Sequence, residues 1–167
     1  MTSPPLSPSA DPSAQPAGIP LHAEPGHLIR RAHQVAVSTF HETHGRHITP
    51  VQYALLRALE EEPGIDQVTL AQRVALDTST TADIATRLEA KGWIVRELLP
   101  RRQRSLSLTD AGRAVLAQML PKVAPMYGQL LGALELDEQA EFLRLLRKFV
   151  QLNDSAPSVE SPGKPEA

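Results

Sequence analysis

Four consecutive hydroxyl side chains, Thr78-Ser79-Thr80-Thr81, stand at the start of a helical segment near the middle of the 167-residue chain. Hydroxyl groups donate and accept hydrogen bonds, and Ser and Thr are also favoured at helix starts. The free N–H groups and the dipole of a helix N-terminus attract anions. The cluster therefore indicates either a simple helix cap or a contact with a polar, negatively charged partner.

A basic run follows further along the chain, formed by Arg101, Arg102 and Arg104. Guanidinium groups bind phosphate oxygens through two parallel hydrogen bonds. Such a run alone is typical of a solvated turn. Hydroxyls at a helix start followed by a basic turn instead favour a nucleic acid as the partner of both.

The elements that must position these side chains are mostly helices. Apolar residues recur at helical spacing, and capping and breaking residues mark the ends. The spacing predicts six helices. The first covers 26–45, the second runs from Thr49-Pro50 to Pro63-Gly64, and the third covers 67–75. The fourth runs from Asp77 or Thr78 to Gly92, the fifth from Thr109 past Pro121 and Pro125, and the sixth from Asp137 onwards. Residues 93–96 and 105–108 alternate as two strands, with 99–103 as a hairpin tip.

Two short helices joined by a tight turn and followed by a basic hairpin are the order of a winged helix-turn-helix. We therefore expect a mainly α fold with a small β-hairpin. In such a fold the second short helix lies in the DNA major groove, and the hairpin reaches phosphates or the minor groove. The candidate DNA contacts are Thr78, Ser79, Thr80, Thr81, Arg87, Arg101, Arg102 and Arg104.

Asp83 is unfavourable in a helix that faces phosphates, because its charge repels them. Arg87 lies four residues later, at the spacing of an ion pair on one helix face. We therefore interpret Asp83 and Arg87 first as a surface pair and Arg87 only second as a base contact.

Two motifs carry a family resemblance. The stretches LEAKGWIVR at 88–96 and SLSLTDAG at 105–112, in this order, resemble the MarR family of bacterial regulators, and the likeness covers about residues 26–152. The resemblance implies a homodimer whose first and last helices interlock and whose winged lobes bind a palindromic operator. It also implies control by a small molecule, commonly an aromatic acid, bound between the dimerisation helices and the DNA-binding lobe.

The segments PGHLIRR at 25–31 and TPVQY at 49–53 are similar to a branch that represses degradation of nicotinate-type or hydroxybenzoate-type aromatic acids. The resemblance thus implies a repressor released by such an acid. The wing departs from the family pattern, because Pro100 stands where an acidic residue usually braces the arginines. We expect a stiffer wing, in which Arg102 is the strongest candidate for a DNA contact.

A carboxylate ligand requires a fixed cation beside an apolar slot. Arg30 or Arg31, with His27 or His33 one turn away and Tyr53 from the next helix, would supply these groups. These five residues form the candidate effector pocket. The alternative is that both arginines are exposed or form salt bridges across the dimer.

Five of the six histidines fall between residues 27 and 47. His41 and His44 lie at i and i+3 and share a helix face, as zinc ligands would. A metal-responsive winged-helix regulator is therefore the alternative function. The absence of cysteine, and of an acid on that face, favours ordinary surface or interface histidines.

Composition limits the remaining possibilities. Residues 1–24 and 153–167 are rich in Ser, Pro and Ala and predict disordered tails. Between them we expect one domain, 25–152, with dimerisation helices over about 26–45 and 110–152 and a DNA-binding lobe over about 49–109. Residues 26–152 carry 16 Lys and Arg against 14 Asp and Glu, a net charge of +2, whereas the whole chain has −2.

The chain lacks the features that enzymes and exported proteins carry. It has no cysteine, no glycine-rich phosphate loop and no nucleophile elbow. We therefore expect neither catalysis nor a cofactor or bound metal. With no secretory signal and no membrane-spanning run, we expect a cytoplasmic protein with no membrane partner.

Overall fold

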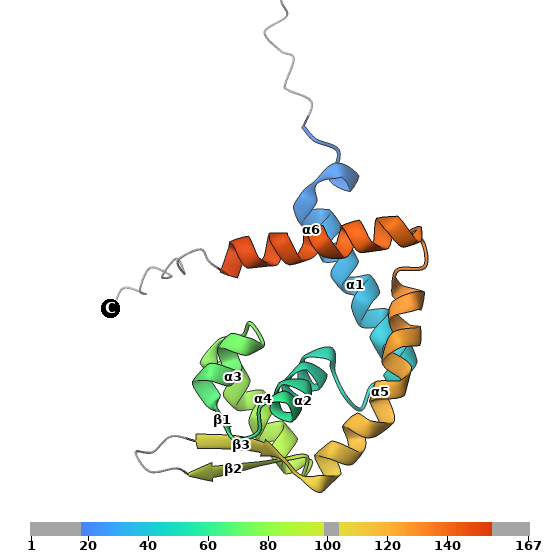
Figure 1. Cartoon of the computed structure of the whole chain (residues 1–167). Coiled ribbons are helices and arrows are strands. Elements are labelled where there is room, and N and C mark those ends of the chain that lie inside the picture. The colour runs from blue at the N-terminus through green and yellow to red at the C-terminus, as the bar shows by residue number, and fades with distance from the viewer. Residues whose placement is uncertain (1–17, 99–103, 155–167) are drawn as a thin grey trace, which may run out of the picture.

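The structure is a computed structural model that describes residues 18–98 and 104–154 (Figure 1). Most of the two expected tails and the whole hairpin tip lie outside these residues. The elements in chain order are η1 (Leu21–Ala23), α1 (Pro25–His44), α2 (Pro50–Glu61), β1 (Ile65–Asp66), α3 (Gln67–Arg73), α4 (Thr78–Ala90), β2 (Ile94–Leu98), β3 (Arg104–Leu108), α5 (Asp110–Leu130) and α6 (Leu136–Asp154). The fold class is confirmed as mainly helical. The turn η1 falls inside the expected N-terminal tail and is closed by the Ala23 N–H, which donates to the Pro20 carbonyl (2.7 Å).

Polar caps determine where the helices begin. Thr49 and Gln52 form a reciprocal capping box at the start of α2, with both hydrogen bonds at 3.2 Å. Asp66 caps α3, Asp77 caps α4 and Thr109 caps α5, each accepting backbone N–H groups of the first helical turn. These groups would otherwise lack partners, which is why the local sequence predicts these starts well.

The sheet has three antiparallel strands in the order β1–β3–β2, where the sequence predicted only a hairpin. Ile65 of β1 pairs with Leu106 of β3, and Ile94 of β2 pairs with Leu108. The prediction missed β1 because two residues are too few to show an alternating pattern.

The lobe formed by α2, α3, α4 and the sheet encloses one apolar core. Leucines from every helix of the lobe meet the inner face of β3 and the first half of α5. The largest fully buried apolar members are Ile48, Leu55, Leu56, Leu59, Leu70, Leu88, Leu106 and Leu116. This continuous core makes α3 and α4 a rigid pair on the surface of the lobe.

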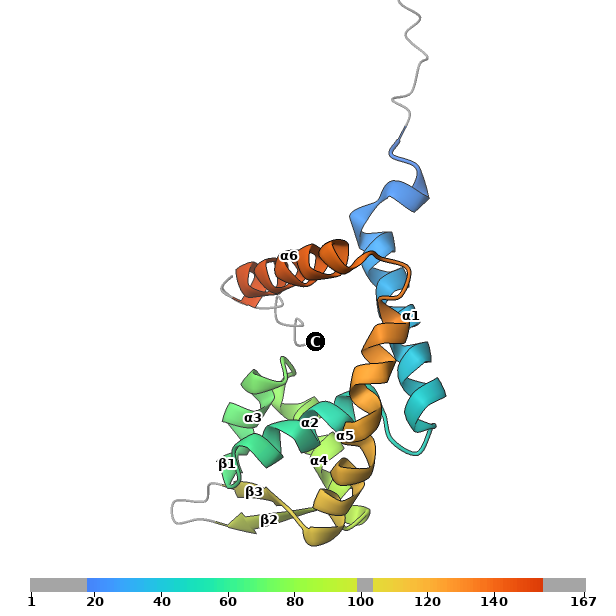
Figure 2. The same cartoon turned by 45° about the vertical axis from the view of Figure 1, so that its right-hand side comes forward.

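The remaining helices form an arm that leaves the lobe. Helix α5 passes Pro121 and Pro125 without ending and runs beside α1. Figures 1 and 2 show α6 at the far end of this arm, near the beginning of α1 and away from the sheet. No described residue of α6 up to position 151 is buried. No described helix is both long and apolar enough to cross a membrane.

Candidate nucleic-acid interface and ligand cavity

Helix α4 presents a polar face to solvent. Ser79, Asp83, Thr86 and Arg87 are exposed at spacings of four, three and one residues. Ala85 and Leu88, on the opposite side, are fully buried and fix the helix on the lobe. A helix held in this way can enter a major groove without rotating about its own axis.

Thr81 corrects the predicted set of contacts. Its side chain is completely buried, and its hydroxyl donates to the Asp77 carbonyl (2.9 Å). At about 100° per residue, position 81 lies on the same face as Ala85 and Leu88. Thr81 is therefore a core residue that closes the first helical turn, and it does not face the groove.

The other hydroxyls of the cluster surround the cap. Ser79 Oγ and Thr80 Oγ1 donate to the two carboxylate oxygens of Asp77, at 2.5 and 2.6 Å. These hydrogen bonds hold the pKa of the Asp77 carboxyl well below its usual range. Both hydroxyls thus use their hydrogen atoms on Asp77 and keep only lone pairs for a further partner. Thr78 and Ser79 are exposed, and Thr80 is half-buried.

The expected ion pair between Asp83 and Arg87 does not form, although the structure describes both residues. Arg87 is exposed on α4 without this partner.

The arginines of the hairpin are only partly described. Arg104 begins β3, while Arg101, Arg102 and Pro100 lie outside the described residues. Strand β2 is linked to α4 through Arg96, whose Nε donates to Glu89 of α4 (2.8 Å).

A cavity of about 820 Å³ opens between the arm and the lobe. Its walls come from α1, α2, the end of α3, the turn before α4, and the second half of α5. The lining is largely apolar and includes Ala36, Val37, Phe40, Ala54, Val74, Ala75, Leu120, Val123, Met126 and Leu130. This volume falls within the range of small-molecule sites.

Two of the five predicted effector residues, His33 and Tyr53, line this cavity. His27, Arg30 and Arg31 do not line it, so the structure does not bring the five residues together in this cavity. Arg30 instead donates to Gln34 (3.1 Å) and lies 3.4 Å from His27 Nδ1 on an exposed face of α1. The α1 residues that line the cavity begin at His33 and continue to Phe40, whereas His27, Arg30 and Arg31 lie nearer the start of the helix.

The sequence prediction missed Arg57, Arg73 and Tyr127, which also line the cavity. Arg57 lies one turn after Tyr53 on α2, and this spacing could have identified it. Arg73 and Tyr127 reach the cavity from distant segments, which no local pattern reports. Burial raises the pKa of the Tyr53 phenol above its usual value. A tyrosine phenol is protonated at neutral pH in any case, and it can donate one hydrogen bond to a ligand.

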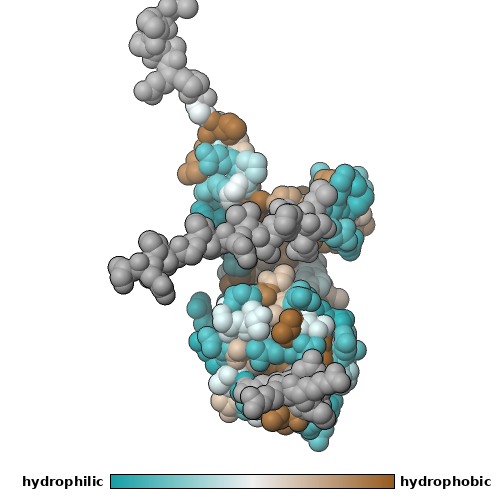
Figure 3. Space-filling view, turned by 90° about the vertical axis from the view of Figure 1, so that its left-hand side faces the viewer, coloured by the Kyte–Doolittle hydropathy of each residue, from teal (hydrophilic) through white to brown (hydrophobic). Residues whose placement is uncertain are grey.

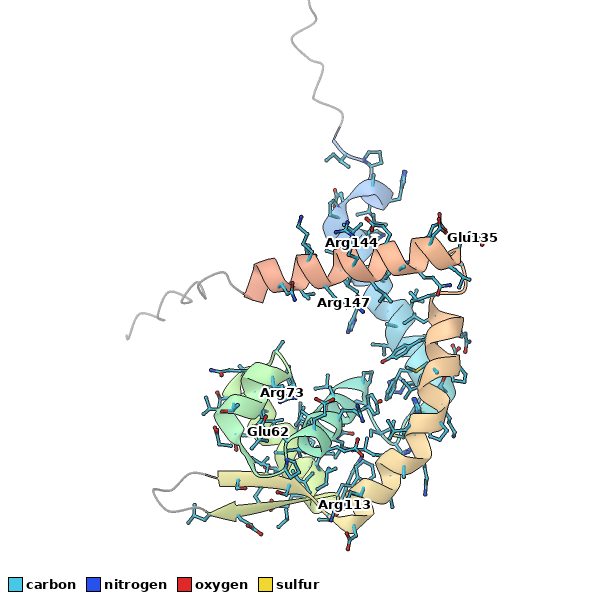
Figure 4. The ribbon with its side chains drawn as sticks, in the orientation of Figure 1. Glu62, Arg73, Arg113, Glu135, Arg144 and Arg147 are labelled. Carbon is cyan, nitrogen blue, oxygen red and sulfur yellow. The ribbon has the colours of Figure 1, made fainter. Side chains whose placement is uncertain are left out.

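The arginines of the cavity wall belong to a chain of ion pairs. Arg57 pairs with Glu60 (2.5 Å) and with Glu61 (3.3 Å). Arg73 pairs with Glu61 and Glu62, both at 2.7 Å. Figure 4 shows Glu62 and Arg73 together at the corner of the lobe where α2 and α3 meet. These ion pairs thus link the end of α2 to the end of α3.

The structure does not support the zinc hypothesis. His41 Nδ1 lies 3.0 Å from the Gly45 carbonyl oxygen, and the His44 ring is buried against Phe40 and Tyr53. The described residues hold no group of three or more side chains placed to bind a metal. The two imidazoles therefore have separate surroundings and do not form one site.

His44 instead makes stability depend on pH. Its Nε2 is buried without a hydrogen-bond partner, and burial, then Lys122 and His47, lower its pKa below 6.5. The unfolded chain therefore binds a proton that folded His44 resists, so stability decreases as the pH falls below about 6.5. We expect His44→Phe to reduce the number of protons taken up on unfolding by at most one, which makes the slope of unfolding free energy against pH shallower. Urea unfolding between about pH 8 and pH 5.5 measures this slope.

The matched control for this prediction is His22→Phe, which changes an exposed histidine of η1. It should leave the pH dependence of unfolding unchanged. A His44→Phe variant with the same pH dependence as the original chain would contradict the assignment.

The paired helices α3 and α4 with the hairpin beside them define a winged helix-turn-helix protein. A family model described as "MarR family" matches residues 48–106. The transcriptional regulator HosA of Escherichia coli is 35% identical over 105 residues, covering 62% of this chain and 78% of HosA. The chain belongs to the MarR family of transcriptional regulators.

Two solved structures extend the likeness to most of the chain. The regulator PcaV of Streptomyces coelicolor, in complex with its natural ligand, is 37% identical with a TM-score of 0.76 and covers 81% of this chain and 97% of that one. Bordetella bronchiseptica BpsR, whose DNA binding is regulated by 6-hydroxynicotinic acid, is 28% identical with a TM-score of 0.75, over 80% and 98% of the two chains.

Proposed function

We propose that the chain is a homodimeric, sequence-specific DNA-binding repressor that a small aromatic carboxylic acid releases from a palindromic operator. One observation carries the proposal: the ligand-sized cavity reaches Val74 and Ala75, in the turn that leads into the recognition helix. A ligand there would contact the segment that positions α4. BpsR, a protein of the same fold, has its DNA binding regulated by an aromatic acid.

The groove contacts we propose come from the exposed side chains at the start and middle of α4. Thr78, Ser79 and Arg87 would read base edges or bind phosphates, with Thr80 contributing through its lone pairs. Arg101, Arg102 and Arg104 of the wing would bind the flanking backbone or the minor groove.

Exposed apolar side chains of α1 and α6 support the homodimer. Leu28, Ile29 and Val35 on α1 are 50–51% exposed, and six apolar residues of α6 are 36–49% exposed: Phe142, Leu143, Leu145, Leu146, Phe149 and Val150. Figure 3 shows hydrophobic surface at the N-terminal end of the described residues, above a lobe whose visible face is mostly hydrophilic. A single chain rarely leaves such a surface in water.

DNA binding is tested with a labelled duplex from the region upstream of the gene and with a scrambled duplex. We expect Arg102→Ala to weaken binding to both duplexes and to reduce the slope of log K against log salt concentration by about one, because one phosphate contact is lost. Lys148→Ala, on the polar face of α6, is the control and should leave the slope unchanged. An unchanged slope for Arg102→Ala would contradict the wing contact.

The mechanism we propose is a shift between dimer populations. Two recognition helices must lie about 34 Å apart to enter successive major grooves. A ligand that binds better to a dimer with another separation lowers the fraction that can bind DNA. The apolar walls of the cavity would hold the aromatic ring, while His33, Tyr53 and Tyr127 would supply hydrogen bonds to ring substituents.

Calorimetric titration of the DNA-free protein tests the ligand class. We expect 4-hydroxybenzoate or 6-hydroxynicotinate to bind, whereas the corresponding methyl esters, which lack the charge, should bind much more weakly. Equal affinity for acids and esters would contradict a carboxylate-binding site.

A further inference from the structure

The cavity contains two fixed positive charges among the described residues that line it, Arg57 and Arg73. Both already contact carboxylates of the chain. Glu61 lies between them, with Oε1 3.3 Å from Arg57 and Oε2 2.7 Å from Arg73. An anion that enters the cavity therefore has to compete with the Glu61 carboxylate for the guanidinium groups of Arg57 and Arg73.

These ion pairs are weak enough to exchange. The side chains of Arg73, Glu61 and Glu62 are 40–53% exposed, and ion pairs in such surroundings contribute little to stability because water screens them. An aromatic acid held by the apolar walls would offer its carboxylate at high local concentration. It could then form the same paired hydrogen bonds with a guanidinium.

Exchange at Arg73 has a direct structural consequence. Arg73 ends α3, and Val74 and Ala75 follow it in the cavity wall. Ala75 has a φ of 53°, a left-handed conformation that costs energy for a residue with a Cβ atom. The turn into α4 is thus held in a strained conformation by its surroundings, of which the ion pairs to α2 are one part.

We propose that Arg57, Glu61 and Arg73 form a carboxylate-exchange site: the ligand carboxylate displaces Glu61 from the two guanidinium groups and so removes one of the two ion pairs that hold Arg73 to the end of α2, leaving the pair with Glu62. The inference rests on the proposed function and deepens it by naming the cations and the contact that is lost. Glu61 acts here as an internal competitor of the ligand, and Arg73 couples the cavity to the recognition helix.

Two variants test the exchange, with 4-hydroxybenzoate as the charged probe and 4-hydroxybenzamide as its uncharged counterpart. Glu61→Gln removes the competing charge and should strengthen 4-hydroxybenzoate binding about tenfold, with no gain for the amide. Arg73→Gln should weaken binding of the acid by about tenfold or more, because a charge-assisted hydrogen bond is lost. Calorimetry gives both affinities, and operator release should require correspondingly less or more acid.

Glu141→Gln and Arg144→Gln are the matched controls, since they break an ion pair on α6 with the same 2.7 Å distance. They should leave the acid affinity unchanged. If Glu61→Gln and Arg73→Gln bind the acid like the original chain while the acid still releases that chain from DNA, the exchange site is wrong and the proposed function stands. If the original chain binds no acid, both proposals are wrong. Should Arg73→Gln fail to fold, Glu61→Gln alone decides.

Discussion

Gly112→Ala is expected to lower the free energy of unfolding by about 1–3 kcal/mol, the usual cost of forcing extra atoms into a packed site. Gly112 lies in the first turn of α5, where an added Cβ would meet the Trp93 carbonyl oxygen at 2.0 Å. That oxygen also accepts the Thr109 N–H (3.0 Å). The neighbour is backbone, so it cannot swing aside, and α5 must move away from the segment between α4 and β2.

Gly128→Ala provides a control in the same helix. An added Cβ at position 128 meets nothing within 4 Å, and alanine is favoured over glycine inside a helix by about 1 kcal/mol. Urea unfolding should therefore show opposite signs for the two substitutions. Equal, small effects would show that α5 does not approach Trp93 as closely as described.

Leu146→Asp is expected to convert the protein to a monomer and to weaken operator binding by about 10²- to 10⁴-fold, the gain that linking two binding modules provides. Leu146 lines an apolar groove between α1 and α6, together with Leu28, Ala32 and Phe142. A carboxylate buried there by a partner subunit would lack a compensating charge. Light scattering after gel filtration measures the mass, and anisotropy of a labelled duplex measures the affinity.

Lys148→Asp introduces the same side chain on the polar face of α6, two residues away. It should leave both the dimer and DNA binding essentially intact. A monomeric Leu146→Asp variant that still binds the full operator like the original chain would refute the role of the dimer, and a dimeric variant would refute the role of this groove.

Local signals predicted the helices because the caps are local. Thr49, Asp77 and Thr109 each satisfy N–H groups within three residues along the chain, so sequence order alone reveals them. The buried position of Thr81 was also available, since it shares the spacing of Ala85 and Leu88. Successive residues of a helix point about 100° apart, so the four adjacent hydroxyls cannot all share one face.

The cavity could not be predicted in the same way. Its wall combines residues from α1, α2, α5 and the α3–α4 turn, which only the tertiary fold brings together. The sequence identified the cations nearest to His33 along the chain, whereas the folded lobe supplies Arg57 and Arg73. Strand β1 was missed for a related reason, because its register depends on β3, about forty residues away.

The most direct test of the account is a single anisotropy titration. The protein is bound to a labelled operator duplex, and 4-hydroxybenzoate, 6-hydroxynicotinate or a methyl ester is added at constant salt. We predict that an acid lowers the anisotropy to that of free DNA in a saturable manner and that the ester does not. A specific complex that persists at saturating concentrations of both acids would contradict a repressor released by small aromatic acids.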